Sequence, residues 1–424
     1  MRILKTNKEI EAFLGLLKRR AGGVDPEIEQ TVKSILADVK KRGEKAVEKY
    51  TRKFDGHALP LRIKASEIRQ YARKADKETV RALELSAERI RVFHEKQKEK
   101  SWSFTKDGAL LGQIIRPIER AGIYVPGGKA SYPSTVLMNV IPAQVAGVRE
   151  VALCVPTPGG EINPYVMAAI HLLGVKEVYR IGGAQAVGAM AFGTEAIKKV
   201  DKITGPGNIY VAMAKKMVFG EVDIDMIAGP SEILIIADNT ADPSFVAADM
   251  LSQAEHDELA SSILVTDSED LTRSVVRELE KQLKGLRRKD IAKKSLSKFG
   301  AVIKVGSLAA AVRVANEVAP EHLEIITRNP LQTAESIRNA GAVFLGRWTP
   351  EPLGDYAAGP NHTLPTGGTS RFSSPLGVYD FVKRTSLLQF SRKGYMLLAN
   401  IVEAIADVEG LEAHANSVRI RKNR

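Results

Sequence analysis

The stretch GPSEILIIADNTADPSFVAADMLSQAEHD, residues 229–257, predicts a turn, a strand, a loop and a helix. Residues 233–237 form an unbroken aliphatic run, which is typical of a strand covered on both faces. Asp242 can cap a helix, and Pro243 suits the first helical position because no N–H donor is needed there. Val246, Met250 and Ala254 then recur every four residues, so we expect them to face a core.

The end of this helix carries a small polar pair. Gln253 and His256 lie three residues apart, which makes them neighbours on a helix surface. An imidazole beside an amide oxygen supplies half of a divalent-metal site, for which zinc is the natural ion. The same spacing also occurs on ordinary solvated helix faces, so both interpretations stay open for the pair alone.

Short apolar runs alternate with helical patterns from residue 113 onward. This alternation is the signature of βαβ units with a largely parallel sheet, and it predicts an α/β fold. The runs are QIIRPI (113–118), AGIYV (121–125), EVALCV (150–155), EVYRI (177–181), VDKI (200–203), EILIIA (232–237) and SILVT (262–266).

Glycine-rich turns follow three of these runs, at 127–128, 182–183 and 205–207. Ligands of parallel sheets gather at the carboxyl ends of strands, where backbone N–H groups meet anions. The turn at Gly182 is not G-x-G-x-x-G, and no acidic residue ends a strand about twenty positions later. Nucleotide binding and a plain tight turn therefore both remain open.

The other regions are expected to be mainly helical. We predict a helix up to Gly22-Gly23, a second helix opened by Asp25-Pro26, and further helix from Ser66 to about Lys100. A long basic helix should follow Thr266, and the tail from about residue 376 should be a separate helical unit. His57 and His94 have no partner spacing and are expected on the surface.

Two later segments carry polar groups at loop positions. Ser307 should cap a helix that stops at Pro320, which leaves Glu321 and His322 between that helix and a strand. The loop at 354–368 contains Asp355 and His362, and such loops on rigid scaffolds are common functional locations. His362 is a further candidate ligand or a loop-structuring group, and Asp249 is a candidate to support Gln253.

Length, composition and charge limit the number of domains and the class of protein. A chain of 424 residues suggests about two to four domains, and 44% hydrophobic residues indicate a globular protein. The net charge of +12 is interleaved along helices, so a solvated surface is favoured over nucleic-acid binding. The single Cys154 lies in an apolar run and excludes an internal disulfide. The charged N-terminus favours the cytoplasm, with no membrane span.

Seven ordered motifs together resemble the histidinol dehydrogenase family. FDG at 54–56 and the charged helices before it also fit that family. The motifs are IYVPGGKASYPSTVLMN (123–139), GGAQAVGAMAFGT (182–194), GPSEILIIAD (229–238), LSQAEHD (251–257), APEHLE (319–324), GDYAAGPNHTLPTGG (354–368) and EGLEAHANSVRIR (409–421).

The resemblance implies a reaction and a set of residue roles. The family oxidises L-histidinol to L-histidine through the aldehyde in two NAD-dependent steps, the last of histidine biosynthesis, with one zinc ion per site. Glu321 and His322 resemble the catalytic bases. The motifs imply Gln253, His256, Asp355 and His414 as zinc ligands. They imply Tyr124, Gln185 and Asn208 as NAD contacts, and Ser231, Glu409, His322 and the four zinc ligands as substrate contacts.

The resemblance also implies an architecture. Two domains with incomplete Rossmann-like parallel sheets are expected, together with small helical segments at both ends. The expected ranges are 1–22, then 23–123 with 233–375, then 124–232 for NAD binding, and 376–424. The family forms a homodimer whose C-terminal segment reaches the partner's active site.

Three other functions compete with this interpretation. A related enzyme could oxidise another amino alcohol or polyol, although Glu409 near His414 suits a cationic substrate. A zinc hydrolase would use the same metal ligands with bound water, but would not need the NAD-type contacts. A nucleic-acid binder would exploit the positive charge, and salt-dependent DNA binding would reveal it.

Overall fold

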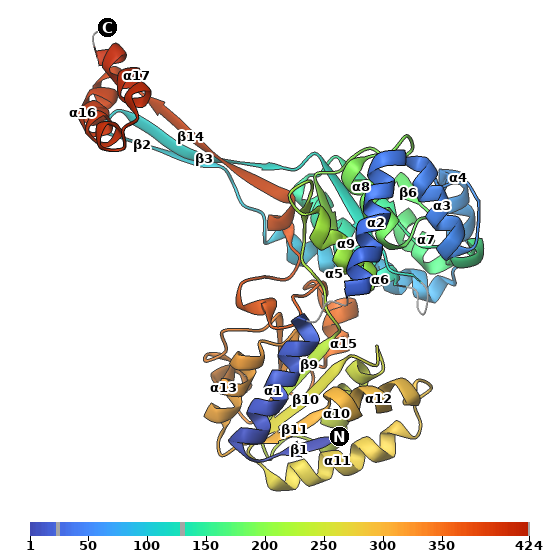
Figure 1. Cartoon of the computed structure of the whole chain (residues 1–424). Helices are drawn as coiled ribbons and strands as arrows, with labels where there is room; N and C mark the ends of the chain where they lie inside the picture. Colours follow the sequence, from blue (N-terminus) through green and yellow to red (C-terminus); the bar gives the residue numbers. More distant parts are fainter. Residues whose placement is uncertain (23–25, 128–131, 423–424) are drawn as a thin grey trace. The chain divides into compact units, whose positions relative to one another are not determined.

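Two parallel sheets and one antiparallel ribbon organise the computed structural model, which describes residues 1–22, 26–127 and 132–422 (Figure 1). The chain divides into two units. Unit 1 comprises residues 1–97 and 119–381, and unit 2 comprises residues 98–118 and 382–424. Unit 1 holds both parallel sheets, so the predicted α/β class with two Rossmann-like sheets is confirmed.

The first sheet, sheet A, has six strands that are all parallel to their neighbours. The run at 232–237 forms one of its central strands, as its aliphatic composition predicts. In spatial order the strands are β1 (Arg2–Leu4), β11 (Ala301–Lys304), β10 (Ser261–Thr266), β9 (Glu232–Ala237), β12 (His322–Ile326) and β13 (Ala342–Leu345).

Helices cover both faces of sheet A, because its strands are apolar on both faces. One face packs against α1 (Asn7–Gly22) and α13 (Leu308–Val318), and the other against α10 (Pro243–Ala254), α11 (Glu269–Leu283) and α12 (Lys289–Phe299). Asp242 and Ser307 cap α10 and α13 as predicted. The single long helix expected after Thr266 is instead two helices, α11 and α12.

The second sheet, sheet B, has the spatial order β6 (Glu177–Tyr179), β5 (Glu150–Cys154), β4 (Arg120–Tyr124), β7 (Lys202–Thr204) and β8 (Asp223–Ile224). From β4 the chain adds strands first on one side, through β5 and β6, and then on the other, through β7 and β8. This reversal creates a topological switch point beside β4, where ligands of such sheets bind.

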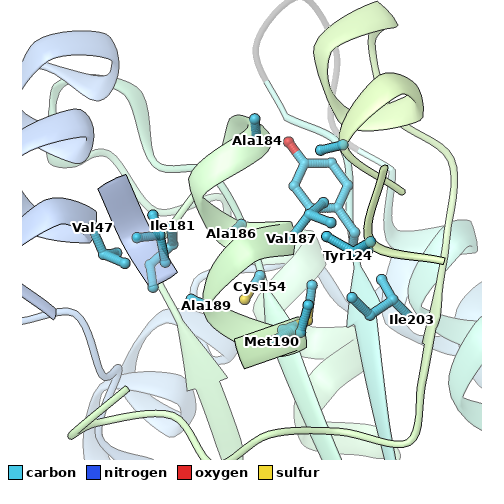
Figure 2. Packing of buried hydrophobic residues seen from close by; sticks show 14 of the residues in the cluster. Val47, Tyr124, Cys154, Ile181, Ala184, Ala186, Val187, Ala189, Met190 and Ile203 are labelled. Atoms are coloured by element: carbon cyan, nitrogen blue, oxygen red, sulfur yellow. The ribbon is translucent and has the colours of Figure 1, made fainter. Parts of the chain in front are cut away.

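Small side chains allow helices to pack closely on sheet B. Figure 2 shows Ala186, Val187 and Met190 of α8 (Gly183–Phe192) against Tyr124, Cys154 and Ile203 of the sheet. The same face also packs against α2 (Pro26–Arg42), α3 (Glu44–Asp55) and α9 (Ile209–Val218), and the opposite face against α4 (Ala65–Ala72), α5 (Lys77–Glu95), α6 (Pro133–Ala146) and α7 (Pro164–Leu172).

The helices before residue 97 differ from expectation in two respects. The apolar side chains of α2 to α5 join the cores of sheet B, whereas residues 23–123 were expected to join the first α/β domain. His57 and His94 are buried, with 7% and 0% exposure, rather than on the surface. Both pack beneath loops that come from far along the sequence, which local spacing does not reveal. Gly23, Asp25 and Gly128 lie outside the described residues.

Unit 2 is built on an antiparallel ribbon of β2 (Trp102–Lys106), β3 (Ala109–Pro117) and β14 (Val382–Phe390). Figure 1 shows α16 (Arg392–Val408) and α17 (Glu412–Lys422) at one end of this ribbon. The run at 113–118 is therefore not in a parallel sheet, and the tail is not purely helical. Every residue of β14 after Val382 is exposed, so no buried face gave the strand a recognisable alternation.

The remaining elements are short. They are α14 (Pro330–Ala334), α15 (Glu351–Leu353), the π-helical turn η2 (Gly354–Ala358), and the 3-10 turns η1 (Pro158–Gly160), η3 (Thr369–Arg371) and η4 (Val378–Phe381). Among the residues that the structure describes, no helix has the length and apolar character needed to span a membrane.

Candidate active site

A buried polar cluster lies at the amino-terminal edge of sheet A. Glu321 and His322 stand where β12 begins, and Ser231 directly precedes β9. Since α10 runs back along the sheet, it ends with Gln253 at the same edge, where Gln253 Nε2 lies 3.5 Å from His322 Nδ1. This edge is opposite to the carboxyl ends where parallel sheets usually bind ligands.

The backbone of Glu232 holds the Glu321–His322 pair. Its N–H donates to Glu321 Oε2 at 2.9 Å, and its carbonyl oxygen lies 3.0 Å from His322 Nδ1. With Nδ1 donating to that carbonyl, Nε2 carries the lone pair and is free to accept a proton. Both side chains are at least 90% buried, so their positions are fixed by β9 rather than by solvent.

Carboxyl groups surround the free nitrogen of His322. Asp355 Oδ1 lies 3.5 Å and Glu351 Oε1 3.9 Å from His322 Nε2. Ligand atoms of these three residues all lie within 4.8 Å of one another, which makes them a candidate metal group. Glu351 was not among the residues predicted from the sequence, because a Glu after Pro350 in a loop carries no local signal.

The pKa values in the cluster follow from burial and from these neighbours. Burial raises the pKa of Glu321 to about 8, although His322 opposes the shift. Burial alone would lower the pKa of His322, but Glu321, Asp355 and Glu351 raise it well above its ordinary value. Burial raises the pKa of Glu351 to about 7. A bound cation would oppose the positive charge on His322, because both would share the same carboxylates.

A second layer of acids supports Glu351. Its N–H donates to Glu324 Oε1 at 2.7 Å, and its Oε2 accepts from Ser252 Oγ at 2.9 Å. Glu324 in turn hydrogen-bonds Asp249, and burial raises the pKa values of both carboxyl groups. Asp249 therefore supports the cluster through Glu324 and Glu351.

Two of the predicted metal ligands of unit 1, Gln253 and Asp355, lie beside His322. The amide oxygen Oε1 of Gln253 is buried without a hydrogen-bond partner, as is His322 Nε2. A buried acceptor without a donor is costly, and a cation would satisfy it. His256 is exposed just beyond α10, where partial desolvation lowers its pKa and Asp355 opposes that effect. The residues present therefore fit a divalent ion.

The other residues expected near the metal have different surroundings. His362 Nδ1 lies 3.0 Å from the backbone oxygen of Asp355, so it supports the η2 turn. Ser231 is half-buried before β9. Glu409 and His414 belong to unit 2, where Glu409 follows α16 and His414 lies on α17, and both are exposed. They are not part of the cluster within unit 1.

The residues predicted to bind NAD follow strands of sheet B. Tyr124 ends β4, and its hydroxyl accepts the N–H of Gly183 at 3.1 Å (Figure 2 shows its ring beside α8). Gln185 is 1% exposed, and both its amide atoms lack a partner. Asn208 caps α9 through the N–H groups of Tyr210 and Val211. Tyr124 ends β4 and Asn208 follows β7, the two strands that flank the switch point, and the bond from Gly183 to Tyr124 brings the start of α8 to it. A polar ligand therefore fits there.

A buried ion pair fixes the turn at 205–207. Gly205 N–H donates to Asp225 Oδ2 at 2.8 Å, and Lys215 Nζ donates to Gly205 O at 2.9 Å. Lys215 and Asp225 also contact each other directly, with side-chain exposures of 2% and 1%. Gly205 has φ +109°, and a Cβ there would lie 2.1 Å from Tyr124 O, so only glycine fits.

The fold and the site together define an α/β enzyme with a buried acid–base and metal-type centre on one sheet and a nucleotide-type edge on another. The family model for histidinol dehydrogenase matches residues 18–422. The histidinol dehydrogenase of Aquifex aeolicus is 54% identical over 429 residues and covers 100% of both chains. That of Geobacter sulfurreducens is 56% identical over 400 residues, covering 93% of each chain.

A solved structure agrees with these sequence matches. The crystal structure of histidinol dehydrogenase from Elizabethkingia anophelis aligns with TM-score 0.94 at 40% identity, covering 99% of this chain and 98% of the other. The chain belongs to the histidinol dehydrogenase family, whose members are oxidoreductases of histidine biosynthesis acting on a small-molecule substrate.

Proposed function

We propose that the protein oxidises L-histidinol to L-histidine in two successive NAD-dependent steps with zinc as the resident metal. The observation that supports this most is the partnerless amide oxygen of Gln253 beside the His322–Glu351–Asp355 group. An oxygen acceptor among carboxylates suits a cation. Membership of the family supports L-histidinol as the substrate.

Gln253, His256 and Asp355 would hold the zinc, with His414 as the fourth ligand. When bound, the ion would orient the amino and imidazole groups of the substrate and neutralise nearby carboxylates. Two histidines, one carboxylate and one amide contain no thiolate, which distinguishes this set from structural zinc sites. Glu351 is an alternative carboxylate within the same space, and metal titration of Glu351→Gln would separate the two roles.

His322 is the proposed base of the first oxidation. Its Nε2 would take the hydroxyl proton as hydride leaves the carbinol carbon for the nicotinamide, which forms the aldehyde. The Glu232 carbonyl fixes the tautomer that this step requires, since it accepts from Nδ1.

Glu321 is the proposed base of the second stage. Its carboxylate would take a proton from water as the oxygen adds to the aldehyde carbon and would give that proton to the former aldehyde oxygen, which forms the hydrate. With a second NAD bound to accept the hydride from that carbon, His322 would take a hydroxyl proton, and ionisation of the resulting acid gives the carboxylate product. A pKa of about 8 allows Glu321 to exchange protons close to neutral pH.

Tyr124, Gln185 and Asn208 are the proposed NAD contacts, and Ser231 and Glu409 are proposed substrate contacts together with His322 and the zinc ligands. The partnerless amide of Gln185 supports the first assignment, because a nucleotide would supply its missing hydrogen bonds. The carboxylate of Glu409 could pair with the substrate's ammonium group.

A homodimer with shared active sites is proposed, so that Glu409 and His414 of one copy complete the site of the other. Exposed apolar side chains on α16 support an interface, since so large an apolar face is seldom left in water. They include Leu397, Leu398, Ile401, Val402, Ile405 and Val408. We also propose a cytoplasmic location, where NAD is available.

Stoichiometry tests the proposed reaction. We expect two NADH per L-histidinol, loss of turnover after chelation, and recovery with zinc. One NADH with release of the aldehyde, or no turnover, would contradict the two-step assignment.

Variants at two histidines separate the metal from the base. His322→Asn should lower turnover strongly while stoichiometric zinc is retained, whereas His256→Asn should lose zinc, as measured by metal analysis. Tight stoichiometric zinc in His256→Asn would show that the ligand set is wrong. Mixing Glu321→Gln and His414→Asn chains should restore part of the activity in verified heterodimers.

A further inference from the structure

An acidic side chain stands at the nucleotide-type edge of sheet B although the second strand of the sheet supplies none. In dinucleotide-binding folds, a carboxylate at the end of the second strand accepts a hydrogen bond from the adenosine ribose. Here the second strand is β5, and the residues after it are Val155, Pro156 and Thr157. Asp55 reaches this edge from α3.

The position of Asp55 is defined by the turns after β5 and β6. Asp55 accepts the backbone N–H of Gly182, the residue that precedes α8. A Cβ on Gly182 would lie 3.5 Å from Asp55 Oδ1 and 3.0 Å from Pro156 Cβ. The carboxyl group therefore lies with both turns, at the place where the second-strand acid of a dinucleotide fold would be.

His57 fastens the same segment to the sheet. Its Nδ1 accepts the N–H of Leu59 at 3.3 Å, so the proton is on Nε2, which donates to Thr157 Oγ1 at 3.0 Å. Gly56, which lies between Asp55 and His57, takes the left-handed conformation, with φ 73°. These bonds hold the chain directly after Asp55, and the N–H of Gly182 bonds the Asp55 carboxylate itself.

One oxygen of Asp55 is left for a ligand. The residue is 9% exposed, and Oδ2 is buried with no hydrogen-bond partner. The nearby Gln185, which is 1% exposed, also has both amide atoms without a partner. Its Oε1 would lie 2.8 Å from a Cβ on Gly183, so the amide covers the first turn of α8. A ligand with hydroxyl donors would satisfy the free carboxylate oxygen.

We propose that Asp55 accepts a hydrogen bond from the adenosine ribose of NAD and selects NAD against NADP. This inference rests on the proposed use of a nicotinamide dinucleotide. The 2′-phosphate of NADP would place a second negative charge against a buried carboxylate that has no neutralising cation bonded to it. The ribose hydroxyl of NAD instead donates to that same carboxylate.

Equilibrium binding of NADH and NADPH to the zinc-loaded protein, followed by nicotinamide fluorescence, tests the inference without turnover. Wild type should prefer NADH, and Asp55→Asn should lower the NADH:NADPH affinity ratio by ~10-fold or more, as expected for loss of a charge-assisted hydrogen bond and of a like-charge repulsion. Asparagine can still accept the Gly182 N–H, so the turn is kept. Asp55→Asn should also lower the ratio of the affinity for ADP-ribose to the affinity for its 2′-phosphate. Binding of NMN, which lacks the adenosine ribose, should not change.

Asp38→Asn is the matched control, because Asp38 is a carboxylate of α2 that bonds Arg42 rather than the turn at Gly182. It should leave the affinity ratio unchanged. If Asp55→Asn weakens both nucleotides equally, Asp55 only shapes the turn and the proposal is wrong. The same holds if wild type binds neither nucleotide. If the protein prefers NADH to NADPH but does not oxidise L-histidinol, the proposed reaction is wrong. The effect of Asp55→Asn on the affinity ratio would still decide the role of Asp55.

Discussion

Arg20 and Glu232 form a buried pair beneath the Glu321–His322 site. The Arg20 side chain is 3% exposed, donates to the Glu232 carboxylate and to Leu259 O at 2.6 Å, and lies over the ring of Phe299. Because the Glu232 backbone bonds both Glu321 and His322, the pair connects the N-terminal helix to the site. Burial raises the pKa of the Glu232 carboxyl group, and the cationic side chain of Arg20 opposes that shift.

Arg20→Met should destabilise the protein by ~3–5 kcal/mol, because it leaves Glu232 buried without its cation. The free energy of unfolding in urea measures this loss. Arg19→Met is the control, since Arg19 is exposed on the same helix turn and should matter little. Adding Glu232→Gln to Arg20→Met should recover part of the stability; a double variant less stable than Arg20→Met would contradict the charge argument.

Asp380 gives a pH-dependent prediction. Burial raises its pKa to about 6 from the ordinary 3.8, against the opposing effect of Lys202. The folded protein therefore binds this proton more tightly than the unfolded chain does. The resulting stabilisation is fully present below pH 3.8 and is lost as the pH rises through 6.

Asp380→Asn should remove this pH-dependent loss of stability. The change in the free energy of unfolding caused by the substitution should be ~1–3 kcal/mol more favourable at pH 7 than at pH 4. The asparagine oxygen can still accept the N–H of Gly377, and Lys202 keeps Asp223 at 2.9 Å. Urea denaturation of both proteins at the two pH values measures the difference. Equal pH profiles for wild type and variant would contradict the shift.

Some residues of the site could be predicted from their type and local spacing. The others could not, because they come together from distant parts of the sequence. Gln253 and His256 could be recognised as a pair because they are three residues apart, although His256 lies in the turn just beyond α10. Glu324 and Glu232 are charged residues inside aliphatic strands, a signal that could have identified them. Arg20 offered none, and Asp55 stood out only within the FDG motif at 54–56, because each reaches its site through tertiary packing of a helix end.

At the scale of elements, the turn at 205–207 depends on α9 and on the residue after β8. Lys215 of α9 and Asp225 after β8 bond opposite sides of Gly205, so the turn is fixed from two directions. This arrangement brings the turn against the end of β4, where the strand carries Tyr124. The geometry of the proposed NAD edge thus depends on one buried ion pair.

Lys215→Met should cost ~3–5 kcal/mol by leaving Asp225 buried and unpaired, and should weaken NADH binding as the turn loosens. Lys216→Met changes the neighbouring but exposed lysine and should stay within about 0.5 kcal/mol of wild type. Fluorescence titration and urea denaturation report the two effects. Unchanged stability in Lys215→Met would show that the turn does not need the pair.

Strands and helices differed in how far the sequence predicted them. The parallel strands β9 and β10 are buried on both faces, and their aliphatic runs show this directly. β14 has no such run, because it pairs with β3 more than 260 residues earlier and its side chains stay exposed. The break between α11 and α12 at residues 284–288 contains no proline and is marked only by Gly285.

At the scale of the whole molecule, α16 exposes an apolar face to solvent. Ile401 and Ile405 are each 55% exposed and lie one helical turn apart, with Leu397 a turn before them. Ala399 and Ala406 are buried on the opposite side, next to α17. A second copy of the chain would cover this face if the proposed homodimer is correct.

The double variant Ile401→Asp/Ile405→Asp should be monomeric in sedimentation velocity and should lose most activity, because two buried charges oppose an apolar interface. Leu331→Asp is the control, since Leu331 is 72% exposed on α14 of unit 1. A variant that stays dimeric would remove α16 from the interface. A fully active monomer would contradict shared sites.

The pairing of β1 with β11 has a consequence for synthesis on the ribosome. Arg2 lies opposite Ala301, so the first strand must wait for nearly three hundred residues to be translated before its partner exists. Until then the apolar side chains of α1 also lack their packing partners; they include Phe13, Leu14 and Leu17. By contrast, α2 to α9 can already pack on sheet B. The nascent chain therefore exposes an apolar N-terminal segment for most of translation, a natural target for chaperones and proteases.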